Sequence, residues 1–138
     1  MNVYLDSSIV LRALLDQPRQ ISAWGEWDRA YSSELLGVEC RRVIDCLRLE
    51  NALDDQALAD AVEQLARIEK TIARVRLTTT IIQSASRSMP AVVKSLDAFH
   101  LVTAMGIRDR HAPDLLFATH DVQQAAAARA LGFTCIES

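Results

Sequence analysis

Short apolar segments alternate with longer stretches of helical periodicity along almost the whole chain. The apolar segments have the length and residue content of strands, and they cover residues 3–5, 30–32, 72–77, 115–119 and 133–136. The longer stretches repeat apolar residues every three or four positions and predict helices over residues 8–15, 21–29, 33–49 (capped by Ser32 or Ser33), 54–70, 78–88, 95–107 and 122–131. Strands that alternate with helices form a parallel sheet covered on both faces. We therefore predict an α/β protein, a three-layer α/β/α sandwich with a mainly parallel sheet of about four to five strands.

The length of the chain fits one domain with a substantial core. It has 138 residues, of which 50% are hydrophobic, and we expect a single domain over residues 1–138. No apolar run approaches the ~20 residues that span a bilayer. The N-terminus has no basic segment ahead of an apolar one, so a signal peptide is not expected. We expect a cytoplasmic protein.

The charge and cysteine content exclude several other classes. A net charge of −3 disfavours a protein that binds nucleic acid through overall charge. Any polyanion site must be a local cluster of arginines, since Lys70 and Lys94 are the two lysines among 15 basic residues. The three cysteines are an odd number without C-x-x-C spacing, which indicates free thiols rather than disulfides or a zinc site.

Four acidic residues stand where predicted strands end or predicted helices begin. Asp6 and Asp121 follow apolar strands, whereas Glu39 and Asp97 lie early in apolar helices. Because the carboxyl ends of parallel strands meet at one edge of a sheet, we expect the four side chains to gather there. Clustered carboxylates repel one another unless a cation lies among them, and oxygen ligands suit Mg²⁺ or Mn²⁺. The combination predicts a divalent-metal site.

Each acid also has a structural explanation when it is taken alone. Asp6 or Asp121 would cap the following helix, and Asp97 lies in a first turn, where the helix dipole favours an anion. Glu39 falls in an apolar stripe, where an ionised carboxylate needs a partner. Either Arg42, three residues later, or a bound cation would supply it.

Four segments of the chain form a pattern when they are taken in order. They are VYLDSS at residues 3–8, SELLGVECRR at 33–42, LDAFHLVTA at 96–104, and ATHD at 118–121 with the Ala-rich helix and Leu131-Gly132-Phe133 after it. This pattern resembles the PIN-domain family, and within it the VapC-type toxins of bacterial toxin–antitoxin pairs. The resemblance implies a PIN-like fold and a metal-dependent endoribonuclease that hydrolyses RNA phosphodiester bonds. It also implies a homodimer that is inhibited by a cognate VapB-type antitoxin.

Carried over residue by residue, the resemblance implies that Asp6, Glu39, Asp97 and Asp121 are the catalytic and metal-binding acids. Asp6 and Asp97 would hold the principal Mg²⁺, for which Mn²⁺ is a substitute. Glu39 would complete the metal shell or orient the attacking water. Asp121 would bind a second ion or tune the first, and residues 115–120 supply no further acid, so the number of ions stays open.

Residues beside the acids have expected supporting roles. Ser8 and Thr119 are predicted to hold carboxylates in place through hydrogen bonds. His100 follows Asp97 by three residues and is interpreted, like His120, as structural or as a neighbour of the ligands.

Surface roles and one alternative function stay open. Arg12 and Arg42 either contact RNA phosphates or form salt bridges. Trp24 and Trp27 either belong to a dimer or antitoxin surface or pack in the core. The alternative function is a PIN fold that binds RNA or a protein partner without cutting it.

Overall fold

A parallel sheet lies at the centre of the computed structural model, which describes residues 1–15 and 24–136. Five strands pair in the order β3-β2-β1-β4-β5, and every neighbouring pair is parallel. The strands are β1 (Asn2–Leu5), β2 (Arg29–Ser33), β3 (Ile72–Val75), β4 (Leu116–Ala118) and β5 (Thr134–Ile136). The predicted fold class is confirmed.

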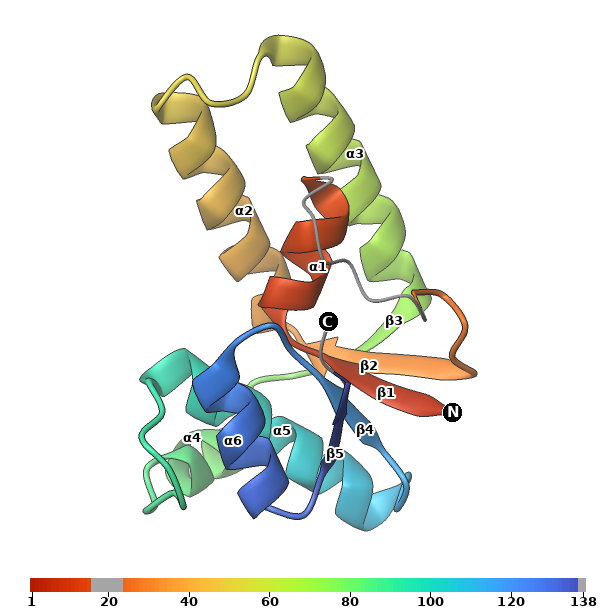
Figure 1. Ribbon diagram of the computed structural model, residues 1–138, viewed down its shortest axis with the longest axis vertical. Helices are drawn as coiled ribbons and strands as arrows, with labels where there is room; N and C mark the ends of the chain where they lie inside the picture. The colour runs from red at the N-terminus through yellow and green to blue at the C-terminus, as the bar shows by residue number, and fades with distance from the viewer. Residues whose placement is uncertain (16–23, 137–138) are drawn as a thin grey trace.

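Helices cover both faces of the sheet (Figure 1). On one face lie α1 (Ser7–Leu14), α2 (Leu35–Leu49) and α3 (Asp55–Thr71), and the long pair α2 and α3 extends away from the sheet. On the other face lie α4 (Thr79–Ala85), α5 (Ser95–Arg110) and α6 (Val122–Ala130). The molecule therefore has the three predicted layers.

The central strand β1 supplies side chains to both halves of the core. Val3 and Leu5 pack in the cluster under α1, α2 and α3, whereas Tyr4 packs with Leu101 and Phe117 on the opposite face. All five side chains are fully buried. This alternation follows from the two-residue period of a strand, and it makes β1 rigid on both faces.

Local signals set most of the helix ends. Asp54 caps α3, because its carboxylate accepts a hydrogen bond from Ala57 N at 2.7 Å. Asn51 follows α2 with a φ of 58°, and Gly132 follows α6 with a φ of 94°. Asn and Gly tolerate this left-handed conformation better than other residues, so they end helices.

The helix predicted over residues 21–29 is wrong in its described part. Residues 24–28 form a turn and irregular backbone, and β2 begins at Arg29; residues 21–23 lie outside the described residues. Gly25 has a φ of 81°, and Asp28 N donates to Met1 O at 2.7 Å. These contacts lead the chain into pairing of Arg29 with Asn2, so strand pairing overrides the helical period. The helix predicted over residues 8–15 is α1, which ends at Leu14.

Other predicted elements differ in their bounds. β3 ends at Val75 rather than at residue 77, because its partner β2 ends at Ser33. Leu77 N instead donates to the carboxylate of Glu34 at 2.6 Å. α4 ends three residues earlier and α5 three residues later than predicted.

Candidate metal centre

The topology brings the four predicted acids to the carboxyl edge of the sheet. Asp6 follows β1 directly, and its N–H donates to Ala118 O of β4 at 3.2 Å. Asp121 lies three residues beyond the end of β4, and it caps α6. Glu39 lies in the second turn of α2, which follows β2, and Asp97 lies in the first turn of α5. Because β2, β1 and β4 are adjacent, these positions converge.

Asp6 is held by hydrogen bonds at both oxygens. Its Oδ1 accepts from the N–H and the Oγ of Ser8, at 3.0 and 2.5 Å, and its Oδ2 accepts from Thr119 Oγ1 at 2.5 Å. The side chain is buried, and burial raises the pKa of Asp6, while the bonds from Ser8 and Thr119 oppose that rise. The carboxylate caps α1 as well, so capping and a functional role coexist at Asp6.

The hydroxyls of Ser8 and Thr119 tie Asp6 to the loop after β4. Ser8 Oγ accepts from His120 N at 2.9 Å, and Thr119 Oγ1 accepts from Asp121 N at 3.0 Å. Each hydroxyl thus donates to Asp6 and accepts from a backbone N–H of that loop. The hydrogen bonds expected of both residues are present.

Asp121 is oriented by the helix that it caps. Its Oδ1 accepts from the backbone N–H groups of Gln123 and Gln124, at 2.9 and 3.1 Å. The fully buried side chain of Gln124 donates from Nε2 to Asp97 O at 3.1 Å. Gln124 therefore links the start of α6 to the start of α5, a connection that the sequence did not indicate.

Glu39 is held by residues from two other helices. Its Oε1 lies 2.6 Å from His100 Nε2, and its Oε2 accepts from Ser7 Oγ at 3.1 Å. Arg42 instead pairs with Asp45 at 3.4 Å, so the predicted alternative of a Glu39–Arg42 pair is wrong. α2 directs Glu39 toward the sheet and Arg42 toward solvent.

The pKa of Asp97 shows that the acids affect one another. Burial raises the pKa of Asp97 most, and the negative charges of Asp121, Asp6 and Glu39 raise it further, while His100 lowers it. The four carboxylates therefore share one region of negative potential.

The donor set fits a hard divalent cation. In the described part of the chain, no Lys or Arg forms an ion pair with Asp6, Asp97 or Asp121. Carboxylate oxygens are the ligands that Mg²⁺ and Mn²⁺ prefer, and a cation would relieve the repulsion among them. Within residues 1–15 and 24–136, no three or more His, Cys, Asp or Glu side chains are arranged to hold an ion as they stand. Some of the acidic side chains must therefore move closer together before three of them can share an ion. The hydrogen bonds to Asp6 and Glu39 leave lone pairs of their carboxylates free for the ion.

Two buried residues beside the acids make contacts that the sequence did not indicate. His100 lies three residues after Asp97, but its hydrogen bonds go to Glu39 through Nε2 and to the hydroxyl of Tyr4 through Nδ1, the latter at 2.7 Å. Tyr4 was predicted only as part of the strand over residues 3–5. A tyrosine in a central strand does carry one signal, because a buried phenol needs a hydrogen-bond partner.

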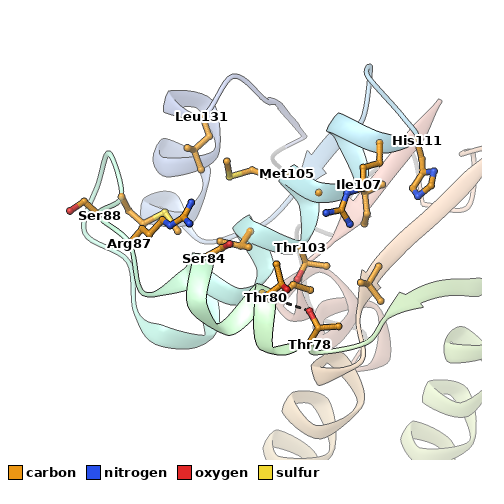
Figure 2. A pocket seen from close by; sticks show the side chains of 16 residues that line it. Thr78, Thr80, Ser84, Arg87, Ser88, Thr103, Met105, Ile107, His111 and Leu131 are labelled. Atoms are coloured by element: carbon orange, nitrogen blue, oxygen red, sulfur yellow. Dashed lines mark hydrogen bonds between the residues drawn. The ribbon is translucent and has the colours of Figure 1, made fainter.

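A cavity of about 580 Å³ lies between α4 and α5, away from the four acids. Figure 2 shows Thr80 and Ser84 of α4 facing Thr103 and Met105 of α5 across it. None of the four acids lines this cavity, so it is separate from the candidate metal centre.

A second cavity includes the two tryptophans. Trp24 and Trp27 pack edge to face with their ring centroids 5.1 Å apart, and both contact the core under α1 and α3. With residues of α3 they line a cavity of about 620 Å³. The two tryptophans thus contribute to the core and also border a hollow in the surface.

The fold and the site define an α/β protein that gathers carboxylates at the carboxyl edge of a parallel sheet. The family model of the PIN domain matches residues 3–130, and the chain belongs to this family. PIN domains are generally nucleases that depend on divalent metals, which places the chain among hydrolases that act on nucleic acid. A comparison with curated proteins found no match. Among the described residues, no helix combines the length and apolar character needed to cross a membrane.

Proposed function

We propose that this chain is a Mg²⁺-dependent endoribonuclease of the VapC toxin type, formed by one PIN domain over residues 1–138. A cognate VapB-type antitoxin inhibits it, and it acts in the cytoplasm. One observation carries the proposal: the negative charges of Asp6, Glu39 and Asp121 act on Asp97, and no arginine or lysine among the described residues pairs with it. Asp6 is buried, and Asp97 and Glu39 are partly buried. Such an arrangement costs stability unless it serves a cation.

Each acid has a distinct part in the proposed site. Asp6 and Asp97 hold the principal ion, and the bonds from Ser8 and Thr119 keep Asp6 in place. Asp121 bonds the start of α6 through Oδ1 and directs its second oxygen to the same ion or to a second one. When bound, the ion lowers the pKa of a water molecule and neutralises charge on the phosphate.

Glu39 completes the shell of the principal ion through the attacking water, which it also orients. Ser7 and His100 hold its carboxylate. When the orientation of a carboxylate is fixed, the water that donates a hydrogen bond to it is also oriented, and this prepares the water for attack on the phosphorus.

Cleavage of RNA by purified variants tests the proposal. Asp97→Asn should lower Mg²⁺-dependent cleavage by more than about 100-fold, the upper range for residues that only support a ligand. Asp114→Asn is the matched control, since Asp114 is exposed and lies outside the cluster. Full activity in folded Asp97→Asn protein would defeat the assignment.

Asp121→Asn should do less damage than Asp6→Asn. Asparagine also caps helices, so α6 keeps its start, and the principal ion keeps Asp6 and Asp97. Equal inactivity of the two variants would show that Asp121 binds the principal ion. Inducible expression with mapping of cleaved RNA ends, beside an Asp6→Asn control, identifies the RNA target.

One observation favours the second candidate function, a PIN fold that binds RNA or a partner without cutting. Within residues 1–15 and 24–136, no three of the His, Cys, Asp or Glu side chains are arranged to hold a metal ion as they stand. Under this alternative, RNA binds and stays intact at saturating Mg²⁺ or Mn²⁺. Cleavage that EDTA abolishes would exclude it.

Protein partners belong to the same proposal. We place the partner surface at the cavity between Trp24, Trp27 and α3. A homodimer would show in light scattering as a mass near twice 15.3 kDa. Gln64→Arg changes an exposed residue of that cavity and should weaken binding of the antitoxin without changing RNA cleavage. A gene for a small DNA-binding protein beside this gene would identify the antitoxin to test.

A further inference from the structure

We propose that Tyr4 and His100 are positioning residues for Glu39. Tyr4 selects the ring tautomer of His100, and His100 in turn directs the Glu39 carboxylate toward the other acids. The inference rests on the proposed function, because that function requires the Glu39 carboxylate to have a fixed orientation.

Two short contacts form a continuous chain from the core to the site. The Tyr4 hydroxyl lies 2.7 Å from His100 Nδ1, and His100 Nε2 lies 2.6 Å from Glu39 Oε1. Tyr4 is 0% exposed and His100 is 1% exposed. Water therefore does not compete for the bond between Tyr4 and His100, and a misdirected imidazole would leave a buried group unpaired.

The chemistry of the Glu39 carboxylate determines the direction of both bonds. An ionised carboxylate can only accept, so His100 Nε2 carries a proton and donates it to Glu39 Oε1. In a neutral imidazole Nδ1 then has a free lone pair, and the Tyr4 hydroxyl donates to it. The opposite tautomer would set the lone pair of Nε2 against the Glu39 carboxylate.

The hydroxyls of Ser32 and Thr103 also lie beside the Tyr4 hydroxyl. Ser32 Oγ donates to Leu5 O at 2.7 Å, and Thr103 Oγ1 donates to Phe99 O at 2.6 Å. Both hydroxyls thus use their protons on backbone carbonyls and do not replace Tyr4 as donors to the histidine.

The position of Tyr4 is also held firmly by strand pairing and ring stacking. It lies in β1, which pairs with strands on both sides, and its ring stacks on Phe117 with centroids 5.3 Å apart and an interplanar angle of 13°. The His100 ring meets it edge on, at a centroid distance of 5.7 Å. Because Ser7 holds the second oxygen of Glu39, three elements of the fold determine where this carboxylate points.

Nitrogen-15 NMR of the histidine rings tests the tautomer directly. The variant Tyr4→Phe removes the phenol proton, and Tyr31→Phe is the matched control, since Tyr31 pairs with Tyr4 in the adjacent strand. In the wild-type protein and in Tyr31→Phe, His100 should carry a proton on Nε2. In Tyr4→Phe it should become a mixture of tautomers. A loss of the His100 signals in His100→Gln assigns them.

Binding of Mn²⁺ without RNA tests the positioning. Tyr4→Phe and His100→Leu should weaken Mn²⁺ affinity by about 10–100-fold, the range seen when a partner of a metal ligand is removed. His100→Gln should keep most of the affinity, since its amide N–H reaches Glu39 in place of Nε2. If His100 had only a structural role, His100→Leu and His100→Gln would bind Mn²⁺ with equal affinity, provided that circular dichroism shows both variants to be folded.

The outcomes separate this inference from the proposed function. A wild-type protein that shows the expected tautomer and binds Mn²⁺ but leaves RNA intact would refute the nuclease proposal alone. A His100 ring in the wild-type protein with its proton on Nδ1 and none on Nε2 would overturn the inference. Equal Mn²⁺ affinity of Tyr4→Phe and Tyr31→Phe would overturn it as well, whether or not RNA is cut.

Discussion

Replacing Thr119 by valine removes one buried hydroxyl from the centre of the proposed site and keeps the shape of the side chain. Thr119 is 0% exposed. Its Oγ1 donates to Asp6 Oδ2 at 2.5 Å and accepts from Asp121 N at 3.0 Å. Thr119→Val therefore loses a bond to a carboxylate and leaves a backbone N–H without its acceptor.

The structure sets the size of the expected loss. A hydrogen bond to a charged group contributes about 1.5–3 kcal/mol, and one between neutral groups about 1 kcal/mol. The free energy of unfolding should fall by about 2.5–4 kcal/mol, which lowers Tm by roughly 8–16 °C for a domain of this size. The pKa of Asp6 should also rise further, because the bond from Thr119 opposes the effect of burial.

Thr119→Val should lower the affinity for a metal ion as well as the stability. Asp6 keeps its bonds from Ser8 but loses the bond that orients Oδ2. Mn²⁺ affinity should fall by about 10–100-fold, as for other partners of metal ligands.

Urea denaturation and calorimetry of Thr119→Val measure the loss, with Thr71→Val as the control. Thr71 is exposed, and its Oγ1 donates to Ile68 O at 2.8 Å, so the control also loses a hydroxyl and a hydrogen bond. It should change stability by less than about 0.5 kcal/mol.

A double-mutant cycle with Asp6→Asn isolates the Thr119–Asp6 bond. A coupling of about 1.5–3 kcal/mol is expected for a bond to a charged group. The reasoning is refuted if Thr119→Val behaves like Thr71→Val, or if the cycle shows no coupling.

Three further predictions concern charge and metal. In the metal-free protein, Asp97→Asn should raise the free energy of unfolding at neutral pH, because the fold raises the pKa of Asp97 and so disfavours its ionised form. The gain should shrink as pH falls from about 7 toward 4. A gain that urea titrations show to be independent of pH would contradict this. Glu69→Gln should cost about 1 kcal/mol by losing its ion pairs with Arg41 at 2.6 Å and Arg74 at 3.1 Å, both partners being partly exposed. Since Arg41 lowers the pKa of Glu69, that cost should be present at neutral pH and vanish in acid, and thermal melts at several pH values check it. EDTA should abolish RNA cleavage, and Mg²⁺ should raise the Tm of the wild-type protein but not that of Asp6→Asn.

Much of the architecture was predictable because it depends on local chemistry. The alternation of strand-like and helical periods indicated a parallel sheet, and the structure confirms it. The caps at Asp54 and Asp121 act on N–H groups two or three residues away. Asp6 was recognisable for the same reason, since it directly follows a buried strand.

The parts that were missed depend on pairing and packing between distant segments. The turn at residues 24–28 is helical in its apolar spacing, yet the chain there is drawn into pairing with β1. β3 ends where its partner strand ends and not where its alternation ends.

The sequence by itself determined the layers, most of the helix starts and the positions at which acids would meet. Only the tertiary structure decided what holds those acids. Glu39 is bonded to His100, 61 residues away, and His100 to Tyr4, 96 residues away. Periodicity and capping are properties of neighbours within a few residues, whereas these bonds exist because α2, α5 and β1 pack at one edge of the sheet.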